Sequence, residues 1–400
     1  MPENDFLLRS SRALEIQRIP TKNQIRIKNR QRRTWAVFQD DGILRLLSYF
    51  ATPRSYKQVL SDSDLVGRTD DRASLIKELL ELGILQIELD VRPRNCPLCQ
   101  NRISTAVATV KNPDFDDMFT YVRCNTCGSV YLNPSPSYDA QNAFYTYSNK
   151  YSDISLLRTT RWENGLRQKS NRLREQIILN AISLEKKTKV LDVGCGTGDF
   201  IIHLAKKYQC QAYGFDPDPK SISSINQTAP FVHTSVGGFE NLDFGKTRFD
   251  IIMLWGVLEH LANPLYILRR SHTMLEAGGI LLLDFPNLQG KTARWSLKNW
   301  PYLHPPFHLT HVDEGSLINA ARNIGYDLHN RSGTRTGSFL LKYSDVILFL
   351  VNASRISYSS SQIDRIVSAI SRPLILLENR FNFNSRTVLV FKLNSSFPKS

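Results

Sequence analysis

The chain has 400 residues, of which 42% are hydrophobic, and it carries 51 Lys and Arg against 37 Asp and Glu, for a net charge of +14. This length predicts two or three domains with their own cores. No apolar run approaches the roughly 18 residues of a membrane-spanning helix, and the N-terminus has acids in place of a signal-peptide core, so we expect a soluble or peripheral, cytoplasmic protein.

The positive charge is concentrated at the two ends of the sequence. Residues 1–33 carry nine Lys or Arg against three acids, and residues 353–400 carry seven against two, which leaves +3 for the 319 residues between them. A basic arm such as RIKNRQRR (26–33) suits RNA, an acidic peptide or anionic lipid. A solvated basic edge without a partner explains the pattern at least as well.

The first elements predict a small α+β module over residues 1–92. Residues 22–39 predict a hairpin, because QIRIKN alternates apolar and polar residues and TWAVFQD follows a polar turn. Helical spacing and a final alternating run predict three helices and a closing strand, over 40–50, 55–62, 70–85 and 84–91. This order resembles the winged-helix, PqqD-like domains that hold precursor peptides, which implies a leader peptide as a partner. A small helical cap on an enzyme is the alternative.

Four cysteines mark a second unit over residues 93–150. Cys96 and Cys99 lie in CPLC, and Cys124 and Cys127 lie in CNTC, so the pattern is C-x2-C-x24-C-x2-C. Two such turns supply four thiolates to a tetrahedral zinc ion. Because no coordination position stays open, we expect a zinc-ribbon-like unit whose Zn²⁺ is structural. Disulfides or a lost site are the alternatives, and a cytoplasmic chain disfavours disulfides.

The two cysteine turns differ at one position. A glycine often follows each turn, and Gly128 follows the second, whereas Gln100 follows the first. The gap of 24 residues is also a little longer than usual. These departures bear on the shape of the loop and not on the metal.

From about residue 161 onward, helical and apolar strand patterns alternate, which predicts an α/β doubly wound sheet. KTKVLDVG (187–194) is a buried strand, DFIIHLAKKYQ (199–209) is a helix, and the turn between them contains Gly194, Gly196 and Gly198. These glycines let the backbone turn sharply and approach a ligand closely. A dinucleotide fingerprint reads G-x-G-x-x-G, whereas this turn reads D-x-G-x-G-x-G.

An acid ends the next predicted strand, QAYGFDPDPKSI (211–222). Asp216 follows the glycine turn by about twenty residues and is placed to accept hydrogen bonds from the two ribose hydroxyls of an adenosine ligand.

Together these features resemble class I S-adenosylmethionine (SAM) methyltransferases. Residues 249–287 are similar to the fourth strand, its helix and the fifth strand of that family. PPFHLTHVDEGSLINAARNIGYDL (305–328) is similar to a segment of the subgroup with the ubiquinone-biosynthesis O-methyltransferases and many sugar and natural-product methyltransferases. The cysteine unit followed by VYLNPSPS (130–137) resembles bacterial enzymes of sugar and cell-surface pathways. The resemblance covers about residues 94–400 and implies a Rossmann-like methyltransferase domain over 151–400.

The resemblance also implies a cofactor site. It places the methionine end of SAM on the loop of Asp192, Gly194, Cys195, Gly196 and Gly198, the ribose on Asp216, the adenine between Phe215 and Pro217, and the sulfonium beside Trp255 and Gly256. Many relatives have an Asp after the third strand, but HTSVGGFENL (233–242) has none, which leaves the adenine amino group to the backbone or Glu240. Cys195 and Cys210 are read as small buried residues.

Methyl transfer is an in-line displacement, so the protein must align the acceptor, exclude water and deprotonate the nucleophile where needed, without requiring a metal. The candidate bases are His260, then His308 and His311, and then Glu259, His304 and Tyr302. Capping or packing of a helix and holding a loop are the alternative roles for Glu259, His260 and His308. His311 is read as structural.

The segment QGKTARWSLKNWPYLH (289–304) mixes Trp295, Trp300 and Tyr302 with four basic residues and occupies the place of the family's acceptor cover. A membrane surface, an RNA base or a plain amphipathic cover also fits this composition. Residues 336–400 predict two apolar helices and a last strand, RTVLVFKLN, that completes the sheet edge.

The function that the resemblance implies is methyl transfer from SAM to an O, N or C atom of a biosynthetic small molecule, natural product or glycan. The alternatives are a peptide-tailoring methyltransferase that binds a leader through residues 1–92, an RNA methyltransferase, and a non-catalytic SAM-binding module. The basic ends favour RNA, whereas the nearly neutral catalytic region opposes it. The acceptor, the methylated atom and the oligomeric state are not specified by the sequence.

Overall fold

The structure is a computed structural model. It describes residues 7–12, 14–19, 24–30, 34–38, 42–51, 54–62, 69–82, 84–87, 91–112, 117–137, 140–141, 161–237, 242–290, 293–294, 297–300, 302–334 and 385–394. Glu240, Trp295 and the two helices expected between residues 336 and 384 lie outside these ranges.

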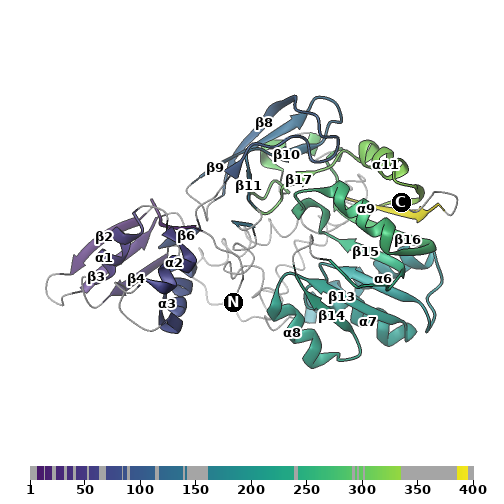
Figure 1. Cartoon of the computed structure of the whole chain (residues 1–400), viewed down its shortest axis with the longest axis horizontal. Coiled ribbons are helices and arrows are strands. Elements are labelled where there is room, and N and C mark those ends of the chain that lie inside the picture. The colour runs from purple at the N-terminus through teal and green to yellow at the C-terminus, as the bar shows by residue number, and fades with distance from the viewer. Residues whose placement is uncertain are drawn as a thin grey trace.

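A seven-stranded sheet organises the described residues after Arg161 (Figure 1). Its strands are β12 (Lys189–Val193), β13 (Gln211–Asp216), β14 (His233–Val236), β15 (Phe249–Trp255), β16 (Leu275–Pro286), β18 (Tyr326–Thr334) and β19 (Arg386–Leu393). Their order is β14-β13-β12-β15-β16-β19-β18, and every neighbouring pair is parallel except the two pairs that β19 forms. The order reverses between β12 and β15, which is where α/β sheets bind their ligands.

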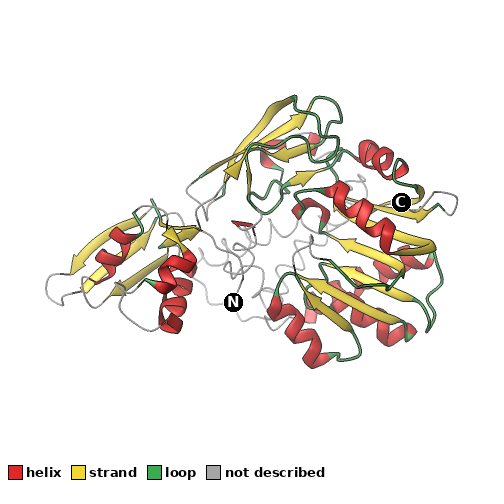
Figure 2. Cartoon of the chain, in the orientation of Figure 1, coloured by secondary structure: helices red, strands yellow, loops and turns green. Residues whose placement is uncertain are grey.

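Helices cover both faces of this sheet (Figure 2). α6 (Arg161–Leu179), α7 (Asp199–Tyr208) and α8 (Pro219–Thr228) pack on one face, and α9 (Pro264–Met274) and α11 (Glu314–Arg322) pack on the other. Because side chains alternate along a strand, Val190 and Ile251 face the first set, whereas Leu191 and Ile252 face the second. The expected Rossmann-like α/β sheet is confirmed.

The last strand does not lie where the sequence suggested. We expected RTVLVFKLN to complete the sheet edge, but β19 is inserted between β16 and β18, and β18 is the edge strand. The apolar character of β19 explains this position, because seven of its eight residues are buried between two antiparallel neighbours.

The four-cysteine unit is built on a second sheet. This sheet includes a strand from beyond residue 150, where the sequence predicted the end of the unit. Its order is β17-β10-β9-β8, from β8 (Ser104–Lys111), β9 (Met118–Cys124), β10 (Val130–Leu132) and β17 (Thr310–His311). β17 comes from the PPFHLTHV segment and pairs antiparallel with β10, which lies far from it in the sequence, through Val130 with His311. A two-stranded sheet of β7 (Val91–Arg92) and β11 (Ser135–Pro136) lies at the start of the unit.

The described residues of the N-terminal module form two small sheets and three helices. β2 (Leu14–Ile19), β3 (Gln24–Asn29) and β4 (Thr34–Phe38) form one sheet, and β1 (Leu7–Ser10), β5 (Arg54–Ser55) and β6 (Leu85–Ile87) form the other. The helices are α1 (Gly42–Tyr49), α2 (Tyr56–Ser61) and α3 (Thr69–Glu81). The predicted hairpin is confirmed as β3 and β4. β1 and β2 were not anticipated, and no described helix of the chain is long and apolar enough to cross a membrane.

Candidate functional site

The glycine turn after β12 is held in a tight, left-handed course. Gly194, Gly196 and Gly198 all have positive φ, of 73°, 52° and 78°. The amides of Gly194 and Cys195 donate to the carbonyl of Phe215 at 2.7 and 3.1 Å, which ties the turn to the end of β13. A Cβ on Gly194 would lie 2.4 Å from Cγ2 of Val257, whereas a Cβ on Gly196 would meet no atom within 4 Å. Gly194 is therefore required by the packing against Val257, whereas Gly196 borders open space.

Asp216 is fixed against this turn. Its Oδ2 accepts from the amide of Gly196 at 2.7 Å, and its Oδ1 accepts from the amide of Asp218 at 2.9 Å. Burial raises the pKa of this carboxyl, and the two amide hydrogen bonds oppose that rise. Each carboxylate oxygen keeps a second lone pair for a hydroxyl donor. The predicted residue thus lies beside the predicted loop.

The two predicted neighbours of the adenine occupy different environments. The ring of Phe215 is 2% exposed and packs near Phe244 in the core, whereas Pro217 is exposed at the end of β13. Phe215 therefore contributes to the turn through its carbonyl.

Arg174, on α6, is a charged residue that the sequence reading did not single out. Its guanidinium lies over the rings of Trp255 and Phe200, with Cζ 4.9 and 5.7 Å from the ring centroids. Among the described residues it has no ion pair within 4 Å. Burial lowers its pKa, and the charges of Asp284 and Asp192 act in the opposite direction. Asp192 is itself buried, which raises its pKa to about 7. A partly desolvated cation without a close anion therefore lies beside the turn.

Beyond the end of β15, a buried arginine joins two acids. Arg386 donates from Nε to Oδ2 of Asp284 at 2.9 Å, and its Nη2 lies 3.0 Å from Oε1 of Glu259. Burial alone would lower the pKa of Arg386, but the charges of Asp284 and Glu259 raise it. Gly256 leaves room for this arginine, because a Cβ at that position would lie 3.3 Å from Nη2 of Arg386.

The two leading base candidates form a pair. The rings of His260 and His308 are perpendicular, with centroids 4.6 Å apart. Nδ1 of His260 lies 3.1 Å from the carbonyl of Phe307, and Nδ1 of His308 lies 2.7 Å from the carbonyl of Tyr302. A carbonyl only accepts, so Nδ1 carries the proton and Nε2 carries the lone pair in both neutral rings. Burial lowers the pKa of both histidines, so both are neutral near pH 7.

The other candidates surround this pair. Glu259 is buried beside it in the 3-10 turn η2 (Leu258–His260), and its Oε2 has no hydrogen-bond partner among the described residues. His304 and His311 have ring centroids 5.5 and 5.9 Å from that of His308. His311 is fully enclosed, which lowers its pKa to about 3 and agrees with a structural role.

Trp300 and Tyr302 belong to the core. Both rings are buried, with centroids 5.4 Å apart. Trp300 closely precedes the histidine segment and follows the 3-10 turn η3 (Leu297–Asn299). These two aromatic residues are therefore not exposed for contact with a membrane or an RNA base.

The four predicted zinc ligands lie together. Their sulfur atoms lie within 4.8 Å of one another, with 3.5 Å between Cys96 and Cys127 and 3.4 Å between Cys99 and Cys124. Sulfurs bound tetrahedrally at 2.3 Å from zinc are about 3.8 Å apart. The donor set and its spacing thus fit zinc. The contact between Cys96 and Cys127 lowers the pKa of Cys127 and raises that of Cys96, as expected for two thiols that share a proton.

The two cysteine turns have the same backbone shape despite their different sequences. The amide of Gln100 donates to the carbonyl of Cys96 at 2.8 Å, and the amide of Gly128 donates to that of Cys124 at 3.0 Å. Gln100 adopts φ 62° and Gly128 adopts φ 73°. The missing glycine is therefore replaced by a residue in the same left-handed conformation.

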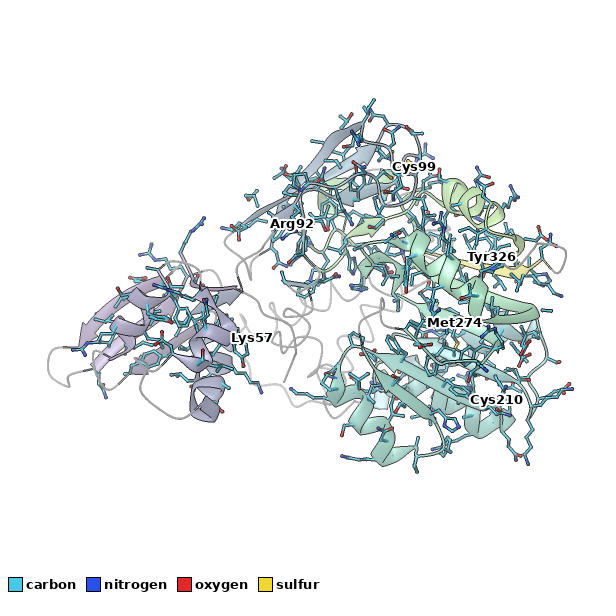
Figure 3. The ribbon with its side chains drawn as sticks, viewed as in Figure 1. Lys57, Arg92, Cys99, Cys210, Met274 and Tyr326 are labelled. Atoms are coloured by element: carbon cyan, nitrogen blue, oxygen red, sulfur yellow. The ribbon has the colours of Figure 1, made fainter. Side chains whose placement is uncertain are left out.

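The other two cysteines are remote from this cluster. Figure 3 shows Cys99 on the four-cysteine unit and Cys210 on the far side of the seven-stranded sheet. Burial raises the pKa of Cys195 and raises that of Cys210 to about 11, so neither is suited to act as a nucleophile.

The four-cysteine unit is hydrogen-bonded to the histidine segments. Arg94 donates to the carbonyls of Leu309, Ala262 and Leu132 at 2.7, 3.0 and 3.2 Å. The hydroxyl of Tyr121 donates to the carbonyl of His308 at 2.7 Å, and Nε2 of Gln141 donates to the carbonyl of His260 at 2.6 Å. The backbone on which both histidines lie is therefore supported by the unit.

The strand order defines a doubly wound domain, with the glycine turn and Asp216 at the point where the order reverses. Residues 166–330 match a family described as "Methyltransferase domain". Residues 166–330 are therefore similar to methyltransferase domains, which agrees with the expected enzyme class and with SAM as the expected cofactor.

Curated relatives match a shorter segment. Two tRNA U34 carboxymethyltransferases are similar to this chain: that of Sulfurimonas denitrificans is 28% identical over 109 residues, 26% of this chain and 37% of the relative, and that of Helicobacter acinonychis is 31% identical over 115 residues, 27% and 44%. The chain thus spans less than half the length of these relatives.

Solved structures are more distant. A putative sarcosine dimethylglycine methyltransferase from Galdieria sulphuraria is 16% identical with a TM-score of 0.42, over 57% of this chain and 86% of that one. Coclaurine N-methyltransferase bound to N-methylheliamine and SAH is 17% identical with a TM-score of 0.40, over 59% and 74%.

Proposed function

We propose that the chain transfers the methyl group of SAM to a hydroxyl group of a biosynthetic small molecule or glycan. The observation that carries this proposal is the pair His260 and His308, which are neutral and fixed in one tautomer, with His260 four residues after Gly256 in the sequence. An amine attacks the methyl carbon with its own lone pair, whereas a hydroxyl must lose a proton. Imidazole lone pairs of this kind can assist that loss.

Cofactor binding is proposed on both sides of the glycine turn. Asp216 accepts hydrogen bonds from the ribose hydroxyls, and the space beside Gly196 receives the methionine end of SAM. Arg174 neutralises the carboxylate of SAM, since it forms no ion pair with the residues that the structure describes and lies over Trp255. Asp192, Cys195 and Gly198 support the turn, and Trp255 lies on the sulfonium side.

The charge around Arg386 supports transfer of a plain methyl group. A carboxymethyl group carries a negative charge, which needs a cation near the transferred carbon. Arg386 is already matched by Asp284 and Glu259, so the described charges of this cluster sum to about −1 at neutral pH. The negative charge of a carboxymethyl group beside Arg386, Asp284 and Glu259 would therefore be repelled.

The four cysteines are proposed to hold a structural Zn²⁺. The ion would close the unit that carries Arg94 and Tyr121, and through them the backbone of the histidine segments. It would leave no position for a substrate.

A second candidate acceptor is tRNA, which the names of the curated relatives favour. To separate the two, the full chain would be incubated with SAM labelled in its methyl group and with fractionated sugar nucleotides, phenolic metabolites or total tRNA. Label in a small-molecule fraction supports the main proposal. Label only in acid-precipitable tRNA replaces the main proposal with the second candidate.

A further inference from the structure

Three side chains beside the proposed acceptor site have ligand atoms that converge. Glu259, His260 and His308 each offer one such atom, and the three atoms lie within 4.8 Å of one another. Ligands bound to one ion at about 2.1 Å are separated by about 3.0–3.5 Å. A small contraction of the three side chains is therefore enough for them to share a cation.

The hydrogen bonds of this cluster prepare it for a metal. Each histidine donates Nδ1–H to a backbone carbonyl, of Phe307 or Tyr302, which fixes the tautomer in which Nε2 carries the lone pair. Metal-binding histidines generally show this arrangement. Oε2 of Glu259 is buried without a hydrogen-bond partner among the described residues. A buried carboxylate oxygen without a donor is costly, and a bound cation would remove that cost.

The surrounding charges also favour a divalent ion. Arg386 faces Glu259 from β19 and would repel a cation, but Asp284 binds the same guanidinium from β16. With one cation and two anions, the cluster has a net charge of about −1, so a divalent ion brings it to about +1. Two histidines and one carboxylate on one side of an ion leave positions open for other ligands.

We propose that Glu259, His260 and His308 bind a divalent transition-metal cation, and that this cation binds the hydroxyl oxygen of the acceptor. The cation lowers the hydroxyl pKa, and the proton leaves to solvent. The oxygen then attacks the methyl carbon, the carbon–sulfur bond breaks, and S-adenosylhomocysteine departs as a neutral thioether. The role in the reaction rests on the proposed methyl transfer, whereas the binding site does not.

Manganese binding to the full chain tests the site. Protein supplied with one equivalent of Zn²⁺, which thiolates prefer to Mn²⁺, is titrated with Mn²⁺ and the free ion is followed by electron paramagnetic resonance. We expect one bound Mn²⁺ per chain without SAM or acceptor, and pulsed resonance showing nitrogen couplings from two imidazoles. This measurement requires neither a variant nor an activity assay.

Variants then assign the ligands. Glu259→Gln and His308→Asn should each weaken Mn²⁺ binding about tenfold or more, whereas His233→Asn, a histidine outside the cluster, should leave it unchanged. SAM affinity and the unfolding temperature of each variant report whether the fold is retained. Absence of Mn²⁺ binding, bound Mn²⁺ without imidazole couplings, or equal affinity in all variants would overturn the site. Methyl transfer by a protein without a cation at this site would overturn the cation's role in the reaction and leave the proposed function standing.

Discussion

The contrast between Gly194 and Gly196 gives the sharpest mutational prediction. Both glycines have positive φ, so alanine at either position costs about 1–2 kcal/mol in backbone strain. Only at Gly194 would the new methyl also overlap a neighbour, Cγ2 of Val257 at 2.4 Å, and overpacking of this kind costs about 1–3 kcal/mol more. Gly194→Ala should therefore destabilise the domain by about 2–5 kcal/mol and Gly196→Ala by about 1–2 kcal/mol.

Thermal unfolding of both variants without SAM measures this difference, at about 2–4 °C per kcal/mol for a domain of this size. SAM affinity should fall more in Gly196→Ala than in Gly194→Ala, because the methyl at Gly196 enters the open space assigned to the cofactor. Adding Val257→Ala to Gly194→Ala should recover part of the loss. Equal destabilisation by the two alanines, or no recovery in the double variant, would refute the reasoning.

Three further predictions concern charged residues. Arg174→Gln should weaken SAM binding about tenfold by calorimetry, as expected for loss of a partly buried charged contact. Arg172→Gln, which changes an exposed residue of the same helix, should leave the affinity unchanged. Equal affinities of the two variants would show that Arg174 does not contact SAM. Arg94→Ala removes one donor from each of three carbonyls and should lower the unfolding temperature and the catalytic rate, while Arg102→Ala does neither. An unchanged rate would show that the cysteine unit does not position the histidines. Burial alone would raise the pKa of Glu175, but hydrogen bonds from Lys207, Tyr208 and His203 outweigh it and lower the pKa to about 2. Glu175→Gln should therefore cost about 2 kcal/mol of stability at pH 7 and progressively less as the pH falls from about 4.5 toward 2. A cost independent of pH would contradict the ionic account.

The sequence was most informative where function depends on local spacing. D-x-G-x-G-x-G predicted the turn, and Asp216 was expected beside it; the structure joins them through the amide of Gly196. C-x2-C twice predicted four converging sulfurs, and they converge. In both cases a few residues in a short segment determine the geometry.

Contacts between distant segments were not predictable from these patterns. Arg386 meets Glu259 across more than a hundred residues, and Arg174 is one of several basic residues on its helix, so neither has a local signature. The pairing of β10 with β17 likewise depends on how two units dock. The position of β19 inside the sheet depends on the antiparallel partners on both sides.

The peptide-binding role of residues 1–92 stays a prediction. The described strands and helices of that module agree with the expected hairpin and helices, and they include no feature that identifies a partner.

The central claim is that SAM binds at the end of β12 and β13 with its ribose on Asp216. Calorimetric titration of SAM into the full chain and into Asp216→Ala tests it most directly. We predict one SAM per wild-type chain and an affinity loss of about tenfold or more in the variant, which loses charge-assisted hydrogen bonds to the ribose. No binding to the wild-type chain, or the same affinity in Asp216→Ala, would contradict the account.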